Sequence, residues 1–137
     1  MTGEVLLDTD ILSSVMRRDP RSLPHAEAYL RQQRAFTFSI ITRYEILRGL
    51  KAKTAQVQLV AFERLCASSR VLPVSEQVVA EASDLYAHLY RSGELIGDAD
   101  ILIAATALTH DLPLVSNNLQ HFNRVPGLQL QSWLRQA

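Results

Sequence analysis

The segment GDADILIAAT, residues 97–106, places two carboxylates directly before a run of apolar residues. With the 3.6-residue period of a helix, Asp100 lies on the same stripe as Ile103 and Ala104, and this apolar stripe should face the core. A buried carboxylate is costly unless something neutralises it. Asp98 lies about 200° away around the same helix, so the two side chains cannot reach one point. We therefore expect Asp98 to cap the helix and Asp100 to point inward as a ligand for a positive group.

Short apolar segments that suit buried strands alternate with helical patterns along the rest of the chain. Strands are expected at 4–8, 35–39, 70–75, 112–118 and 128–134, and helices at 9–19, 24–33, 40–53, 56–68, 76–93 and 99–111. This alternation predicts an α/β fold, a parallel sheet with helices on both faces. A chain of 137 residues is expected to form one domain, residues 1–137.

Composition argues against several classes of protein. The 14 basic and 14 acidic side chains cancel, so no global charge attracts nucleic acid or a membrane. All basic residues except Lys51 and Lys53 are arginines, which suit bidentate phosphate contacts but also occur on ordinary Arg-rich surfaces. The single cysteine, Cys66, excludes an intramolecular disulfide and a cysteine zinc site. With no signal-peptide pattern and no apolar run of roughly 20 residues, we expect a cytoplasmic protein with no membrane partner.

Acidic and polar side chains follow the predicted strands. Asp8 follows the first strand, Glu45 lies shortly after the second, and Ser116 and Asn118 end the segment LPLVSNN. Ligands of parallel α/β sheets bind at the carboxyl ends of the strands. Together with Asp100, these side chains are therefore expected to gather at one edge of the sheet.

Each of these residues also has a purely structural interpretation. Asp8 could be an ordinary helix N-cap, although Thr9 and Asp10 could cap equally well. Thr42 and Glu45 have the spacing of a capping box, unless Ser39 is the cap. Ser116 and Asn118 could simply form a turn. The four histidines have no metal-binding spacing and are expected to be structural or solvent-exposed.

A cluster of oxygen ligands without His or Cys favours a hard cation, Mg²⁺ or Mn²⁺. Such ions activate a water molecule and stabilise charge on phosphate oxygens. The sequence therefore points to phosphodiester or phosphoryl chemistry.

Four segments in order, LLDTDILS, ITRYEILRGL, DADILIAATAL and LVSNNLQHF, resemble those of the PIN-domain ribonucleases, and most closely the VapC-type toxins of bacterial toxin–antitoxin pairs. Each motif alone is weak, but the ordered set covers nearly the whole chain. The resemblance implies a PIN-like three-layer α/β/α domain with a mainly parallel central sheet.

The resemblance also implies the roles of individual residues. Asp8, Glu45 and Asp100 take the positions of the family's acids. Asn118 takes a fourth position that is often Asp, a departure that should weaken any second metal ion. Metal ligands would be Asp8 and Asp100, with Glu45 and Asp98 as further candidates; other candidate site residues are Thr9 and Ser116.

A Mg²⁺-dependent endoribonuclease follows from this resemblance, with Mn²⁺ as the alternative ion. It would be a homodimer that cleaves structured RNA such as tRNA and is inhibited by a VapB-type antitoxin. Because the chain has no net charge, RNA contacts would come from local arginines, with Arg17, Arg43 and Arg48 as candidates.

Two alternatives stay open at this point. One is a haloacid-dehalogenase-type phosphatase, in which Asp8 is the nucleophile and Asp10 the general acid, although the chain is short for that fold. The other is a non-catalytic PIN module that binds RNA or a protein partner. A covalent aspartyl-phosphate would support the first, and metal-dependent RNA cleavage lost in Asp8→Asn would exclude the second.

Overall fold

Five short parallel strands form the centre of the molecule. The structure, a computed structural model, describes residues 3–134, and the strands lie side by side in the order β3-β2-β1-β4-β5. Their bounds are β1 Leu6–Leu7, β2 Thr37–Ser39, β3 Arg70–Leu72, β4 Leu114–Val115 and β5 Leu130–Gln131. The first strand along the chain, β1, occupies the middle and pairs with β2 on one side and β4 on the other. The predicted parallel sheet is confirmed.

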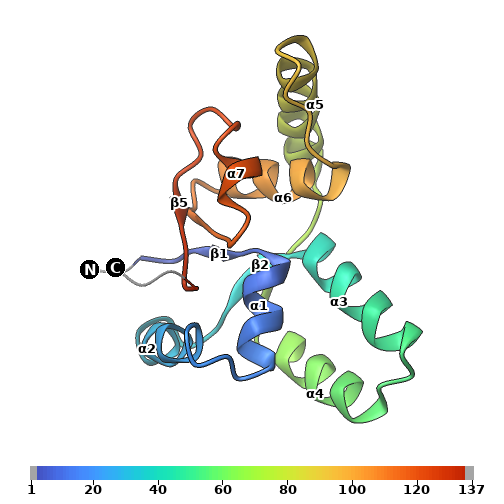
Figure 1. Cartoon of the computed structure of the whole chain (residues 1–137), viewed down its shortest axis with the longest axis vertical. Helices are drawn as coiled ribbons and strands as arrows, with labels where there is room; N and C mark the ends of the chain where they lie inside the picture. The colour runs from blue at the N-terminus through green and yellow to red at the C-terminus, as the bar shows by residue number, and fades with distance from the viewer. Residues whose placement is uncertain (1–2, 135–137) are drawn as a thin grey trace.

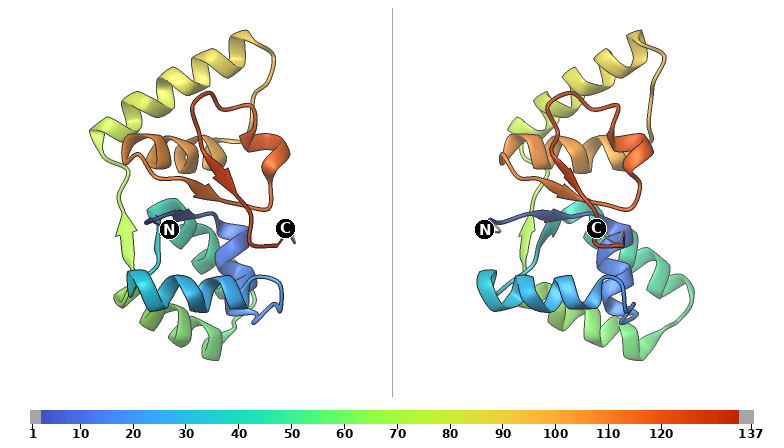
Figure 2. Two further views of the ribbon diagram at one scale, coloured as in Figure 1. Left: turned by 90° about the vertical axis from the view of Figure 1, so that its left-hand side faces the viewer. Right: turned by 60° about the vertical axis from the view of Figure 1, so that its left-hand side comes forward.

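Helices cover both faces of this sheet (Figures 1 and 2). In Figure 1, α5, α6 and α7 lie above β1, while α1, α2 and α4 lie below it and α3 runs downward to its right. The bounds are α1 Thr9–Met16, α2 Leu23–Gln33, α3 Ile40–Ala52, α4 Gln56–Ala67, α5 Glu76–Arg91, α6 Asp98–Thr109 and α7 Leu119–Phe122. The described part of the chain thus has the expected three-layer α/β/α architecture.

The period-2 alternation of the strands divides the core into two halves. Leu6 and Leu114 point into a cluster with α5 and α6, while Leu7 and Val115 point into a second cluster with the helices on the opposite face. All four side chains are fully buried. Because both faces of the central strands are apolar, β1 and β4 are fixed in register, with Leu6 opposite Leu114 and Leu7 opposite Val115.

Several element boundaries differ from those expected. The strands are shorter than predicted, since each pairs with its neighbours over no more than three residues. Helix α1 ends at Met16 rather than at Asp19, since Arg18 has a positive φ of 58° that turns the chain away. The four-residue helix α7 was not predicted; it is a single turn within a segment rich in turn-forming residues.

The start of α6 also differs from the prediction. Gly97, not Asp98, occupies the N-cap position, and its carbonyl accepts the hydrogen bond from the Ile101 N–H at 3.0 Å. Asp98 is the first helical residue, so its predicted capping role is wrong. The predicted apolar stripe is confirmed, because Ile103, Ala104 and Ala107 are fully buried.

Candidate functional site

Asp8 lies where β1 ends, at the carboxyl edge of the sheet. Its side chain is nearly fully buried and accepts hydrogen bonds from the Thr9 N–H at 2.8 Å and from the Ser116 hydroxyl at 2.7 Å. Burial, and then the nearby charges of Asp10 and Asp100, raise the pKa of Asp8 to about 7. Asp8 is also the N-cap of α1, so its expected capping role is confirmed. A capping role alone does not explain why the pKa of Asp8 is raised.

Asp10 adds a further carboxylate at this edge, although its place in the sequence indicated only a helix cap or part of a phosphatase motif. Its Oδ2 accepts a hydrogen bond from the Asn117 N–H at 3.1 Å. Its Oδ1 is buried and has no hydrogen-bond partner among the described residues. Burial raises the pKa of Asp10, and the hydrogen bond from Asn117 opposes that rise. A buried carboxylate oxygen without a donor is suited to a cation.

Glu45 reaches the same edge from α3. Ser39 is the N-cap of this helix and accepts from the Ile41 N–H at 2.9 Å, so Glu45 lies in the second turn and the capping-box interpretation is wrong. The Thr9 hydroxyl donates to Glu45 Oε1 at 2.6 Å. Arg48 Nη2 lies 3.7 Å from Glu45 Oε2. Thr9 therefore connects the end of β1 to α3.

Asp100 reaches the edge from α6. Its Oδ2 lies 3.5 Å from His121 Nδ1, and the side chain is 25% exposed. Burial raises the pKa of Asp100, contact with His121 lowers it, and the charge of Glu45 raises it again. His121 was expected to have only a structural or exposed role, and its pairing with Asp100 could not be found from spacing because the two residues belong to different elements.

Ser116 and Asn118 hold the neighbouring loop rather than adding charge. The fully buried Ser116 hydroxyl donates to Asp8 and accepts from the Asn118 N–H at 2.9 Å. The Asn118 side-chain amide lies 2.9 Å from His121 Nδ1. In this geometry Asn118 contacts His121, which in turn contacts Asp100.

Asp98 lies apart from the other acids. It is exposed and borders a hollow between α5 and α6 with Val79, Tyr86 and Leu102. The two aspartates of GDAD thus point in different directions, as the helical period required.

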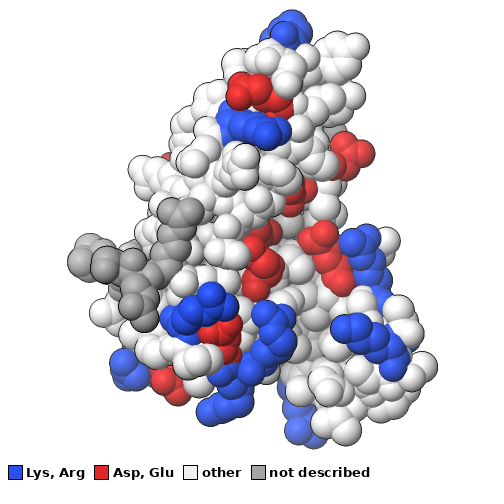
Figure 3. All heavy atoms as spheres, viewed as in Figure 1, with Lys and Arg blue, Asp and Glu red and all other residues white. Residues whose placement is uncertain are grey.

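The three candidate RNA-binding arginines lie in different places. Arg17 borders a groove of about 590 Å³ that Thr9, Glu45, Arg18 and Lys53 also line. Arg43 is paired with Glu63 at 2.7 Å, and with Arg48 it borders a separate hollow on α3. Figure 3 shows acidic side chains along a hollow in the middle of one face, with Lys and Arg side chains beside it on the lower half of the molecule.

The donor atoms of this edge are carboxylate oxygens, the ligands that Mg²⁺ and Mn²⁺ prefer. Within residues 3–134, no three His, Cys, Asp or Glu side chains are close enough to form a ready-made metal cluster. The acids form an open arrangement, which suits an ion that keeps several water molecules and uses one or two carboxylates. The unpartnered Asp10 Oδ1 supports the same fit.

Known proteins share this arrangement of elements. The model of the family described as "PIN domain" matches residues 5–128, most of the chain. The chain belongs to the PIN-domain family. Ribonuclease VapC2 of Haemophilus influenzae is 31% identical over 130 residues, which cover 94% of this chain and 97% of that protein. This identity places the PIN domain among the VapC ribonucleases, metal-dependent enzymes that cleave phosphodiester bonds, and sets the phosphatase alternative aside.

Two further similarities extend over nearly the whole chain. The tRNA(fMet)-specific endonuclease VapC of Salmonella typhimurium is 27% identical, over 93% of this chain and 96% of that protein. The solved structure of DNA-bound VapBC from the same organism superposes with a TM-score of 0.85 at 26% identity, over 96% of this chain and 99% of that one. Within residues 3–134, no helix of this PIN domain has the length and apolar character to cross a membrane.

Proposed function

We propose that this PIN domain is the toxin of a VapBC-type toxin–antitoxin pair, an endoribonuclease that uses Mg²⁺ or Mn²⁺ to cleave structured RNA such as tRNA. The name of the Salmonella relative, a tRNA(fMet)-specific endonuclease, supports the substrate class. The VapBC complexes among the similar structures support a small VapB-type antitoxin as the partner. We also propose a homodimer as its assembly.

The observation that carries this proposal is the approach of acids from separate elements to one edge of the sheet. Asp8 and Asp10 come from the end of β1 and the start of α1, Glu45 from α3 and Asp100 from α6. The negative charges of Asp10 and Asp100 raise the pKa of Asp8. The negative charge of Glu45 likewise raises the pKa of Asp100. Acids that repel one another at neutral pH are stabilised by a bound cation.

In this proposal Asp8 and Asp100 bind the metal ion, with Asp10 Oδ1 and Glu45 as further ligands, and Asp98 lies outside the ligand set. The bound ion supplies the Lewis acidity that lowers the pKa of a water molecule and stabilises charge on the scissile phosphate. Asp8 must release its proton to act as a ligand. Ser116 and Thr9 hold the carboxylates of Asp8 and Glu45 in place, and Asn118 holds the ring of His121.

The test is cleavage of unfractionated tRNA by the purified protein with Mg²⁺, Mn²⁺, Ca²⁺ or EDTA. We expect cleavage with Mg²⁺ or Mn²⁺ and little with Ca²⁺, because the larger ion tolerates irregular coordination and positions water less well. Full activity in excess EDTA would overturn the metal mechanism.

Two variants complete this test. Asp8→Asn removes a ligand charge with little change in shape, and it should abolish cleavage. Asp84→Asn is the matched control, because it makes the same chemical change on the exposed surface of α5, and it should cleave at the wild-type rate. If wild type and Asp8→Asn bind tRNA equally and neither cleaves it, the domain is a binding module. Growth arrest on expression, relieved by an adjacent small open reading frame, would identify the antitoxin.

A further inference from the structure

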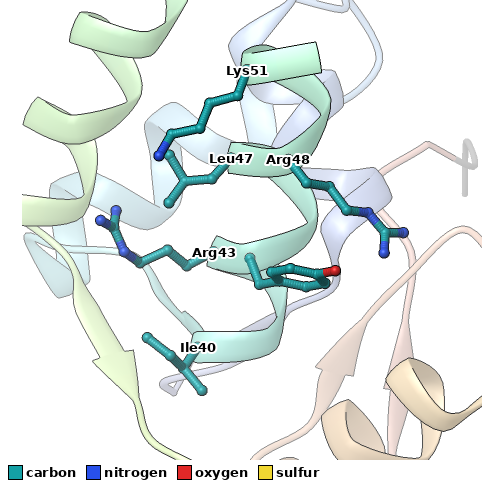
Figure 4. Close-up of a pocket in the computed structure, with 6 residues that line it drawn as sticks. Ile40, Arg43, Leu47, Arg48 and Lys51 are labelled. Carbon is teal, nitrogen blue, oxygen red and sulfur yellow. The ribbon is translucent and has the colours of Figure 1, made fainter.

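The outer surface of α3 carries a hollow that the acidic site does not use. It has a volume of about 320 Å³ and is lined by Ile40, Arg43, Tyr44, Leu47, Arg48 and Lys51 (Figure 4). Three of these six side chains are cations, in a chain whose charges cancel overall. This hollow, the α3 hollow, therefore combines basic side chains with an aromatic ring, although Arg43 is paired with Glu63 and so contributes little free charge.

Arg48 connects the α3 hollow to the acidic site. Its guanidinium carbon lies 5.1 Å from the centre of the Tyr44 ring, and its Nη2 lies 3.7 Å from Glu45 Oε2. In Figure 4, Arg48 projects to one side of α3, and Arg43 and Lys51 project to the other. Among the cations of the hollow, Arg48 is thus the one that contacts an acid of the site.

Tyr44 is an exposed aromatic residue that directly borders the acidic site in sequence. The side chain is 57% exposed, although a large aromatic ring in water forgoes the stabilisation of burial. It directly precedes Glu45, and Arg48 lies over its ring. Exposed rings combined with cations are the recurring means by which proteins hold unpaired nucleotides, since every base has a face that can stack.

We propose that Tyr44 and Arg48 hold the RNA substrate beside the acidic site, with an unpaired base stacked on the Tyr44 ring and an adjacent phosphate on Arg48. This inference rests on the proposed ribonuclease function. An acidic cluster repels a polyanion, so the substrate needs cations at its border. Arg48 supplies such a charge one helical turn from Glu45, and Tyr44 selects for unpaired over fully base-paired RNA, because only an unpaired base can stack on it.

The test is the binding of fluorescein-labelled unfractionated tRNA to the full chain in EDTA, measured by anisotropy at several salt concentrations. Tyr44→Ala should weaken binding on the order of tenfold, the scale of one lost stack. The slope of log K against log salt should not change, since a stacked ring releases no counterions. Arg48→Ala should reduce that slope by about 0.7–0.9, because one phosphate contact is lost.

Two further variants distinguish stacking from a structural role. Tyr44→Phe keeps the ring and should restore binding that Tyr44→Ala loses. Tyr90→Ala is the matched control, since Tyr90 is an exposed tyrosine of α5, 65% exposed, with no site acid beside it in sequence. It should bind tRNA as the wild type does.

Three results would overturn the inference. The first is Tyr44→Ala binding tRNA no more weakly than Tyr90→Ala. The second is a loss that Tyr44→Phe shares. The third is a change in sedimentation or antitoxin affinity in Tyr44→Ala without a change in tRNA binding, which would make the α3 hollow a protein interface. Failure of the ribonuclease function itself would appear differently, as a wild type that cleaves no RNA with Mg²⁺ or Mn²⁺.

Discussion

Asp8 and Asp10 at the end of β1 are held differently from Glu45 and Asp100 on the helices. The strand-end pair receives hydrogen bonds from Ser116 and from backbone N–H groups, and no cationic side chain pairs with either residue in the contacts of the described chain. The helix pair is more exposed, and each member has a basic side chain beside it, Arg48 for Glu45 and His121 for Asp100.

This difference has a physical consequence. No cation compensates a buried carboxylate that is held only by neutral donors, so burial favours its protonated form. The pKa of Asp8 accordingly rises to about 7. A carboxylate beside a cation is already partly compensated. The strand-end pair should therefore gain most from a bound metal ion, and the helix pair should adjust the position of the ion and the substrate.

The largest expected effect is on cleavage. Asp8→Asn and Asp100→Asn should each lower kcat/KM for tRNA by more than about 100-fold, because even the loss of an outer partner of a metal ligand costs about 10–100-fold. Rates measured for both variants beside Asp84→Asn test this. An Asp100→Asn enzyme with nearly full activity would show that only the strand-end pair binds the ion.

The next effect is on stability against pH in EDTA. The folded-state pKa of Asp8 lies above its value in the unfolded chain, so the folded state binds the proton more tightly. Ionisation of Asp8 therefore costs nothing below the unfolded pKa and destabilises the fold increasingly as pH rises to about 7. The melting temperature of the wild type should fall between about pH 4 and pH 7, and Asp8→Asn should show a smaller fall. Equal falls in both proteins would remove Asp8 as the cause.

Metal binding should reverse that loss of stability. A ligand that binds only the folded state at about 100 times its Kd adds roughly 2.7 kcal/mol, several degrees for a domain of this size. Asp100→Asn should relieve repulsion, so the metal-free variant should melt at or above the metal-free wild type. The same variant should lose most of the shift in melting temperature with millimolar Mg²⁺ or Mn²⁺. A full shift in this variant would contradict its assignment as a ligand.

A smaller effect is expected from the hydroxyl that positions Asp8. Ser116→Ala removes the donor to Asp8 Oδ2 and the acceptor of the Asn118 N–H. It should lower kcat/KM about tenfold, the lower end of the range for such outer partners. His121→Ala removes the partner of the more exposed Asp100 and should cost less. A larger loss of kcat/KM in His121→Ala than in Ser116→Ala would mean that Asp100 depends more on its neighbouring side chain than Asp8 does.

The sequence alone predicted the features of the site that depend on the helical period and on the order of strands and helices along the chain. Asp8 and Asp100 could be expected at one edge because parallel strands end together and because a helix has a fixed period. Helices on both sides of a parallel sheet followed from the alternation of elements. In the structure, the consecutive residues Leu6 and Leu7 point to opposite faces of the sheet and pack into separate core clusters. This arrangement explains why the segment is apolar at consecutive positions.

The missed features depend on contacts between distant segments. The orphaned oxygen of Asp10 results from its position against the loop at Asn117, and the role of His121 results from the short helix α7, which turns its ring toward Asp100. Neither contact has a local signature, because more than a hundred residues separate Asp10 from Asn117 and the turn at α7 has no apolar period. The cap of α6 was misassigned because Gly97 and Asp98 are both acceptable N-cap residues.

The smallest expected effect is that of Asp98, and it tests how the two aspartates of GDAD are divided. Asp98 is exposed in the first turn of α6, where its charge interacts favourably with the helix dipole, an effect of about 0.3–1 kcal/mol. Asp98→Asn should therefore lower the melting temperature only slightly, both with and without metal, and keep the metal-induced shift and the cleavage rate. Asp98→Asn and Asp100→Asn remove the same charge at positions two residues apart. A difference between their metal-induced shifts therefore reports on the position of the carboxylate and not on the loss of charge. If Asp98→Asn erased the metal shift while Asp100→Asn preserved it, the ion would be bound on the α5 side of α6, and the inward stripe would have no part in the site.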